Sequence, residues 1–129
     1  AEQYFRQGAA YYEREQYDQA CGWYLAGLKK DPRNAVGYNL LGMVYRMKFI
    51  KTGDPAWRDK EEEAFLKAVK LDPRLVAAVK NLAVTLFQQG RRKMAAQYLR
   101  RALELYPHDP ERELMERMMG EAEGAGSGT

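Results

Sequence analysis

The sequence predicts an all-α fold of about seven helices, arranged as three successive antiparallel hairpins followed by one closing helix. Three turns of similar form contain prolines that lie 41 and then 34 residues apart, Pro32, Pro73 and Pro107. Three small residues upstream repeat these spacings in the reverse order, Gly8, Gly42 and Ala83. Self-similarity at a period of about 20–50 residues is typical of repeat proteins. Each of the three units is therefore expected to be one helix hairpin.

Apolar and small residues recur three and four positions apart within the units, which places them on one face of a helix. The first unit, residues 1–34, carries this pattern twice: Tyr4, Gln7, Gly8 and Tyr11, then Ala20, Tyr24, Gly27 and Leu28. The third unit, residues 76–109, repeats it on both sides of a turn at Gly90: Val79, Leu82, Ala83 and Leu86, then Ala95, Leu99, Ala102 and Leu103. We expect the small residues where two helices approach closely, and the large ones in the core: Tyr11, Tyr24, Tyr45, Phe65 and Leu99.

The middle unit, residues 35–75, carries a seven-residue insertion between Tyr45 and Phe65. Seven residues are about two helical turns. Asp54 followed by Pro55 has the composition of a helix start, with an N-cap and a proline at the first helical position. We therefore expect each helix of this hairpin to be about one turn longer, with three large apolar residues covering the protruding tip, Phe49, Ile50 and Trp57.

The end of the chain predicts a capping helix over residues 110–119. Asp109-Pro110 repeats the cap-and-proline start, and an apolar stripe follows it: Leu114, Met115, Met118 and Met119. Such a helix covers the open side of the last repeat. The pattern is lost after residue 119. The sequence thus predicts a single domain over residues 1–119 and a flexible tail over residues 120–129.

Composition argues against catalysis and against bound cofactors. The chain of 129 residues has one Cys and one His, and its one Ser, Ser127, stands in a glycine-rich tail. A catalytic triad and the common zinc-site spacings are therefore absent, as are phosphate-binding glycine loops. Paired acidic residues are interpreted as solvated helix faces. The sequence predicts no enzyme, no metal site and no cofactor.

Nucleic acid and membrane are not the expected partners. The net charge of +3 comes from 21 basic and 18 acidic residues, which is a weak field for binding phosphates. A basic cluster in the third unit leaves phosphate binding as a minor alternative: Arg91, Arg92, Lys93, Arg100 and Arg101. No apolar run is long enough to span a membrane. The start at Ala1 without Met indicates a cut or processed chain, so the compartment stays open, with the cytoplasm favoured over the periplasm.

The residues of these units resemble the tetratricopeptide repeat (TPR) family. The resemblance covers residues 1 to about 109 and rests mainly on two strings: Tyr38, Leu41, Gly42 and Tyr45, and Ala95, Leu99, Ala102 and Pro107. It implies a right-handed superhelix, an α-solenoid. Two positions depart from the pattern. Gln7 replaces an apolar residue, and Glu61 stands where Ala20 and Ala95 stand in the other units, so we expect the middle hairpin to be splayed or rotated there.

The resemblance implies a binding function. In this family the first helix of each unit lines an inner wall that holds an extended peptide or a partner helix, so the chain is predicted to be a protein-interaction scaffold. The residues expected to form this groove are Phe5, Ala9, Tyr12, Asn39, Met43, Arg46, Lys80, Asn81, Val84 and Phe87. Apolar members would form a floor, and the Asn, Lys and Arg members would contact an apolar, partly acidic peptide.

Family members that bind the acidic tails of heat-shock chaperones use a Lys, Asn, Asn, Lys, Arg set on this wall. Here the matching positions are Phe5, Ala9, Leu40, Ala77 and Asn81. The sequence therefore argues against chaperone tails as ligands. Two alternatives stay open: the wall residues pack against each other or against a neighbouring copy, or the chain self-assembles into a homo-oligomer through its uncapped first helix, which carries Tyr4 and Tyr11.

Overall fold

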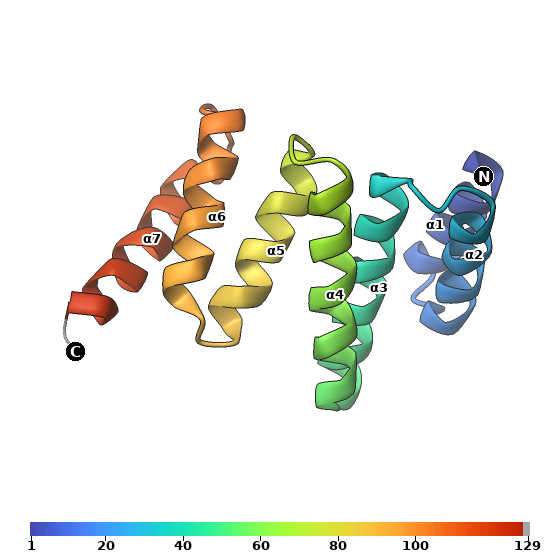
Figure 1. Cartoon of the computed structure of the whole chain (residues 1–129). Helices are drawn as coiled ribbons and strands as arrows, with labels where there is room; N and C mark the ends of the chain where they lie inside the picture. The colour runs from blue at the N-terminus through green and yellow to red at the C-terminus, as the bar shows by residue number, and fades with distance from the viewer. Residues whose placement is uncertain (128–129) are drawn as a thin grey trace. The chain divides into compact units, whose positions relative to one another are not determined.

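The structure is a computed structural model that describes residues 1–127, with side chains up to Gly124. The described residues form seven α-helices and no strand (Figure 1). Their bounds are α1 (Glu2–Glu13), α2 (Tyr17–Lys30), α3 (Ala35–Thr52), α4 (Pro55–Leu71), α5 (Val76–Gln88), α6 (Arg92–Leu105) and α7 (Arg112–Ser127). The predicted all-α helical-repeat fold is confirmed.

The chain divides into two compact units, residues 1–72 and residues 73–129, which we call the N-terminal unit and the C-terminal unit. The N-terminal unit holds the hairpins α1–α2 and α3–α4, with α2 packed on α3. The C-terminal unit holds the hairpin α5–α6, with α7 packed on α6. The boundary falls at the second predicted turn. The organisation as one domain over residues 1–119 and the superhelix stay predictions.

Small residues bring the helices of the N-terminal hairpins together, as predicted. Tyr24 packs on Gly8 across the first hairpin, so closely that a Cβ on the glycine would overlap the ring. Phe65 packs on Gly42 across the second hairpin in the same way, and a Cβ there would lie 2.5 Å from Cε1 of the ring. Both rings are fully buried. Each glycine is thus required by the aromatic residue opposite it.

The insertion lengthens both helices of the second hairpin, which confirms the prediction. Helices α3 and α4 have 18 and 17 residues, against 12 to 14 in the other four hairpin helices. Helix α3 continues through Thr52 and ends at Gly53, which has a left-handed φ of 71°. The side chain of Asp54 then accepts a hydrogen bond from the Ala56 amide at 3.0 Å, with Pro55 at the first helical position.

Two of the three apolar residues at the tip of this hairpin are covered. The Trp57 ring stacks on Tyr45 at a centroid distance of 5.8 Å, and the Arg58 guanidinium lies 4.1 Å from the centre of the Phe49 ring. Ile50 instead remains 62% exposed. The predicted apolar cap therefore consists of Phe49 and Trp57, while Ile50 projects into solvent.

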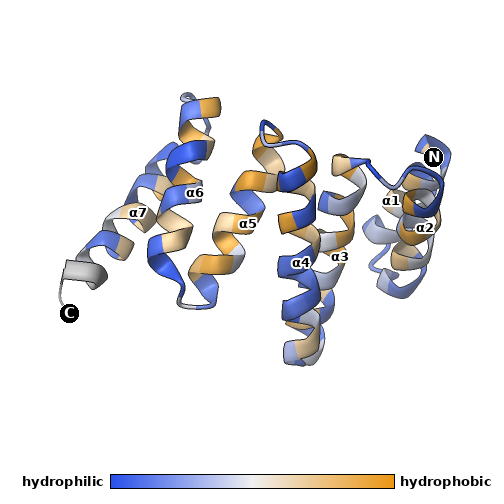
Figure 2. Ribbon diagram, viewed as in Figure 1, coloured by the Kyte–Doolittle hydropathy of each residue, from blue (hydrophilic) through white to orange (hydrophobic). Residues whose placement is uncertain are grey.

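The C-terminal unit is built on an apolar α5. Figure 2 shows hydrophobic residues along most of α5 and a hydrophilic start of α6. Leu82, Leu86 and Leu99 are almost completely buried. Between α5 and α6, the close-packed positions are held by alanines that are fully buried, Ala83 and Ala95. The residues that the sequence pattern placed in the core of this hairpin, Leu82, Leu86 and Leu99, are buried in the structure.

Helix α7 extends beyond the boundary that the sequence pattern predicted. It begins at Arg112 and continues to Ser127, whereas a helix over 110–119 and a flexible tail over 120–129 were expected. Two contacts explain the extension: Ala122 is 1% exposed, and the Glu123 carboxylate pairs with Arg100 of α6 at 2.6 Å. Residues 128 and 129 of the expected tail lie outside the described residues.

Candidate functional site

The predicted groove residues are distributed over both units, and each unit is described by itself. In the N-terminal unit, α1 carries Phe5, Ala9 and Tyr12, and α3 carries Asn39, Met43 and Arg46. In the C-terminal unit, all four lie on α5: Lys80, Asn81, Val84 and Phe87. Eight of the ten are half-buried, and the exceptions are Phe5 and Asn39, which are buried. Eight of the ten predicted side chains are thus partly exposed, but several of them already have partners within the chain.

Phe5 is a core residue, which corrects its prediction as an exposed floor residue. Its side chain is 9% exposed and packs on two glycines, Gly27 of α2 and Gly37 of α3. The ring also lies 6.4 Å from that of Tyr24. Phe5 thus joins three helices of the N-terminal unit and is unavailable to a ligand.

Tyr12 is engaged with the second helix of its own hairpin. Its ring meets that of Tyr17 edge to face at 5.5 Å. Burial, with the neighbouring Tyr17 hydroxyl, raises the pKa of Tyr12 above its ordinary value of 10.0. The phenol therefore stays neutral at physiological pH and could serve only as a hydrogen-bonding group at the edge of a site.

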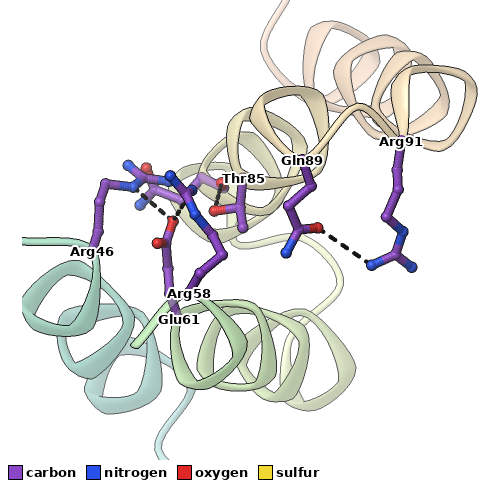
Figure 3. A network of polar contacts seen from close by, with 7 residues as sticks. Arg46, Arg58, Glu61, Thr85, Gln89 and Arg91 are labelled. Atoms are coloured by element: carbon purple, nitrogen blue, oxygen red, sulfur yellow. Dashed lines mark hydrogen bonds and ion pairs between the residues drawn. The ribbon is translucent and has the colours of Figure 1, made fainter. Parts of the chain in front are cut away.

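Arg46 is the partner of the unexpected carboxylate Glu61. Figure 3 shows the Glu61 side chain between Arg46 of α3 and Arg58 of its own helix. The Glu61 Oε2 atom accepts from Arg46 at 3.0 Å and from Arg58 at 3.2 Å. The Arg46 guanidinium also lies 4.9 Å from the centre of the Phe65 ring. A buried carboxylate is tolerated when it is paired in this way.

This cluster overturns the expectation that the middle hairpin is splayed at Glu61. The Glu61 side chain is completely buried, and the close contact of Gly42 with Phe65 persists beside it. The carboxylate is accommodated by two cations rather than by separation of the helices. Arg46 is therefore held inside the hairpin, with 20% of its side chain exposed.

Lys80, also predicted to face a ligand, is paired with the start of the last helix. Its ammonium group donates to both carboxylate oxygens of Asp109 at 3.0 Å and pairs with Glu111 at 2.5 Å. Asp109 is buried and also accepts from the Glu111 amide at 2.8 Å. Lys80 thus connects α5 to the turn that precedes α7.

The pKa values of this pair follow from its contacts. The backbone hydrogen bond from Glu111, together with Lys80, holds the pKa of Asp109 below its ordinary value of 3.8 despite burial. Burial acts to lower the pKa of Lys80, but the hydrogen bonds to Glu111 and Asp109 outweigh it and raise that pKa above 10.5. Both charged forms are therefore favoured by folding.

We predict an acid-sensitive contribution of Asp109 to stability. Because its pKa is lower in the folded state, the carboxylate stabilises the fold above pH 3.8, and this contribution is lost as the pH falls through the folded pKa. Lys80 behaves in the opposite sense, stabilising below pH 10.5 and losing this effect as the pH rises through its folded pKa.

Asp109→Asn should therefore lower the free energy of unfolding at pH 7 by about 1–2 kcal/mol and flatten its decline below pH 4. Urea unfolding followed by circular dichroism from pH 2 to pH 7 measures both effects. Asp59→Asn, at an exposed position of α4, is the matched control. If the free energy of unfolding fell as steeply below pH 4 in Asp109→Asn as in the unchanged protein, the prediction would be contradicted.

The basic cluster of the C-terminal unit is also engaged in internal contacts. The Arg92 guanidinium lies 4.5 Å from the centre of the Phe87 ring, Arg100 pairs with Glu123 of α7, and Arg101 donates to the Pro73 carbonyl at 3.2 Å. The pairing of Arg100 with the acidic last helix agrees with a solvated, internally compensated face. Phe87, which was predicted to face a ligand, is covered by Arg92 on one side.

The residues that could support chemistry are few. Cys21 is half-buried in α2, and burial raises the pKa of its thiol above 9.0, so the reactive thiolate is disfavoured. His108 is exposed in the turn after α6. Within residues 1–127 no three His, Cys, Asp or Glu side chains gather as metal ligands would. Across the same residues, no helix combines the length and the apolar character of a membrane span.

Comparison with known families connects this repeated hairpin to a defined class. Residues 8–48 match the profile described as TPR repeat, and residues 76–109 match the profile described as Tetratricopeptide repeat. The two matches together cover more than half of the chain. This chain is a tetratricopeptide repeat protein. No curated protein matches its sequence significantly.

Solved TPR structures share the fold of this chain at low sequence identity. The Arabidopsis OM64 TPR domain is 23% identical, with a TM-score of 0.79 and coverage of 93% of each chain. The first TPR of Spaghetti (RPAP3), bound to the HSP90 peptide SRMEEVD, is 22% identical, with a TM-score of 0.79 and coverage of 96% of this chain and 93% of that one. The TPR2B domain of yeast Sti1, in complex with an Hsp70 peptide, is 17% identical, with a TM-score of 0.79 and coverage of 96% of each.

In this TPR protein the sequence did not reveal the partners of its charged wall residues. Glu61 was recognised as a departure from the repeat, but Arg46 lies 15 residues away on the opposite helix, and Asp109 lies 29 residues from Lys80. One signal in the sequence could have pointed to these pairs. Charged residues stand at positions that the repeat pattern places near packed helix faces. Half-buried members with apolar or amide side chains are left as the candidate contact residues: Ala9, Met43, Asn81 and Val84.

Proposed function

We propose that this TPR protein is a non-catalytic scaffold whose first helices bind a peptide segment or a helix of a partner protein. The observation that carries the proposal is a partly exposed apolar residue on each of these helices, Ala9 on α1, Met43 on α3 and Val84 on α5. Partly exposed apolar side chains gain further burial when a partner covers them. Unbranched Met adapts to ligands of different shape.

Two of the solved relatives support a peptide as the ligand. The Spaghetti TPR domain is bound to an HSP90 peptide, and the yeast Sti1 domain is in complex with an Hsp70 peptide. Amide side chains on the first helices, Asn39 and Asn81, supply hydrogen-bonding groups beside the apolar residues. Asn39 is buried at 7% exposure, so of the two amides Asn81 is the better candidate for contact with the backbone of an extended peptide.

The ligand class differs from that of the chaperone-binding relatives. Of the positions that would recognise an acidic chaperone tail, Phe5 lies in the core, and Ala9, Leu40 and Ala77 carry no polar side chain. Of the cations on these helices, Lys80 and Arg46 are paired with Asp109 and Glu61, and Arg6, next to Phe5, pairs with Glu2 at 3.5 Å. Recognition is therefore expected to depend on apolar side chains of the partner rather than on a terminal carboxylate.

Site-specific cross-linking tests this proposal. Benzoylphenylalanine placed at Met43 or Val84 should give cross-linked partner proteins in an extract of the source cells. The same group placed at exposed positions of the second helices, Gln19 or Gln97, should not. An excess of the peptide SRMEEVD should leave the cross-links unchanged. Equal yields from all four positions would contradict the surface, and loss of cross-links with the peptide would contradict the exclusion of chaperone tails.

Self-assembly through the first hairpin is a second candidate function. The ring of Tyr4 on α1 lies 5.8 Å from that of Trp23 on α2, both are half-buried, and Leu25 is 48% exposed. Such an aromatic pair suits a contact with a second copy. Sedimentation velocity over a range of protein concentrations distinguishes the two functions, since a monomer that does not change with concentration excludes self-assembly.

A further inference from the structure

A hollow with a cavity volume of about 550 Å³ lies on the second hairpin, and the proposed function does not use it. Helix α3 contributes Tyr38, Leu41 and Tyr45 to its lining. Helix α4 contributes the remaining residues, Lys60, Glu63, Ala64, Leu66, Lys67 and Lys70. All of them belong to the N-terminal unit. We call this feature the lysine hollow.

The lysine hollow and the proposed peptide surface occupy different faces of α3. Tyr38, Leu41 and Tyr45 are spaced by three and four residues and share one face. At about 100° per residue, Met43 is rotated from each of these three residues by about 140–160°. One helix thus presents two separate surfaces, and a ligand in the hollow need not compete with one on the other face.

The charge of the lysine hollow is positive and is not neutralised internally. Three lysines and one glutamate line it. Ion pairs elsewhere in the N-terminal unit are made by other cations, among them Arg6, Arg46, Lys48 and Arg58. The three ammonium groups are therefore free to meet an anion that comes from outside.

Aromatic rings position two of these lysines. The Lys60 ammonium lies 5.8 Å from the centre of the Tyr45 ring and 5.2 Å from that of Trp57. The Lys67 ammonium lies 6.0 Å from the centre of the Tyr38 ring. A cation over an aromatic face is held at that place by the ring's quadrupole. The Lys60 and Lys67 ammonium groups, although exposed, therefore stand near the two ends of the α3 face.

The floor between these cations is apolar. Leu41 and Ala64 are buried, and Leu66 is half-buried. Pockets of about 300–1,000 Å³ hold small ligands or single large side chains, and this hollow falls within that range. If a ligand placed an apolar group on this floor, acidic groups next to it on the ligand would lie within reach of the lysines. Tyr45 is buried and Tyr38 is half-buried, and each ring already lies beside a lysine of the hollow.

We propose that the lysine hollow is a second docking site, for an acidic peptide segment that carries one apolar anchor side chain. Its apolar residue sits on Leu41 and Ala64, and its carboxylates pair with Lys60, Lys67 and Lys70. Charge complementarity identifies the partner, since the hollow carries two more positive than negative side chains. The site would let the scaffold hold two protein segments on one hairpin.

Intrinsic fluorescence of Trp57 can report on this site. The chain has two tryptophans, so Trp23→Phe leaves Trp57 as the sole emitter, next to Lys60 and stacked on Tyr45. The probe is the acetylated hexapeptide EEDLEE, with the uncharged QQNLQQ and the anchorless EEDGEE as comparison peptides. We expect EEDLEE to change the emission with saturation, and each comparison peptide to bind at least about tenfold more weakly at low salt.

Charge reversal distinguishes binding in the lysine hollow from general attraction of the peptide to a positively charged protein. Lys67→Glu/Lys70→Glu should weaken EEDLEE binding at least about tenfold, whereas Lys29→Glu/Lys30→Glu, with the same change in net charge on α2, should weaken it less than about threefold. Circular dichroism checks that all variants fold, which is expected because these lysines are exposed.

Three results would overturn the proposal: no saturable change in emission at millimolar EEDLEE, equal affinities for the two charge-reversed variants, or equal affinities for EEDLEE and EEDGEE. A hexathymidylate that displaces EEDLEE at equal concentration would also overturn it and indicate a nucleic-acid site. Substitution at Met43, on the other face of α3, should leave EEDLEE binding unchanged. Failure of this site and failure of the proposed peptide surface are therefore distinguishable.

Discussion

Phe65→Ala is expected to lower the free energy of unfolding by about 3–5 kcal/mol. The Phe65 side chain is completely buried, contacts Gly42 across the hairpin and lies beneath the Arg46 guanidinium. Its removal leaves a cavity that the two rigid helices cannot fill. Urea unfolding followed by tryptophan fluorescence measures the loss in the N-terminal unit, because both tryptophans lie there.

A double-mutant cycle with Gly42 tests whether the close contact is the cause. Gly42→Ala alone should be destabilising, since its Cβ would lie 2.5 Å from the Phe65 ring. In a Phe65→Leu background the same change should cost clearly less. The matched control is Gly22→Ala in α2, where a Cβ meets nothing within 4 Å, and which should stabilise by about 0.5–1 kcal/mol. Equal effects of the two glycine changes would refute the contact.

Arg46→Met is expected to cost about 3 kcal/mol or more, because it removes one of two cations from a completely buried carboxylate. The Glu61 side chain would retain Arg58 at 3.2 Å but lose its partner on the opposite helix. Arg6→Met is the matched control: Arg6 pairs with Glu2 where both side chains are mostly exposed, so its loss should change stability by less than about 0.5 kcal/mol. Thermal and urea unfolding of both variants measure the difference.

The same cycle shows whether Arg46 acts through Glu61. In a Glu61→Ala background the buried charge is gone, and alanine is the residue at this position in the other two repeats, Ala20 and Ala95. Arg46→Met should then cost much less than in the unchanged protein. A cost that is equal in both backgrounds would mean that Arg46 stabilises the hairpin through Phe65 alone.

The helices and their contacts could be predicted from the sequence because they depend on local spacing. Gly42 and Phe65 belong to stripes with a period of three and four, and Asp54-Pro55 marks a helix start by its own chemistry. These features need no knowledge of the distant chain. The hairpins, the buried aromatic residues and the longer middle unit follow directly from them.

The contacts of the charged wall residues could not be predicted, since a side chain's partner depends on positions far along the chain. Arg46 and Lys80 were predicted to face a ligand, yet Glu61 and Asp109 pair with them. The lysine hollow was missed for the same reason, because it needs α3 and α4 together. The length of α7 was missed because glycine-rich sequence conceals the buried Ala122.

The extended second hairpin has a consequence for how this repeat tolerates changes in length. An insertion divided as about one whole turn per helix leaves every residue below it at its former angle, so the Gly42–Phe65 contact is unaffected. An insertion of one or two residues in α4 before Phe65 would rotate the side chains that follow by about 100° per residue and turn the ring away from Gly42. Duplications and deletions near Gly53 are thus acceptable in steps of about seven residues, and the tip is the natural place to graft a longer recognition element.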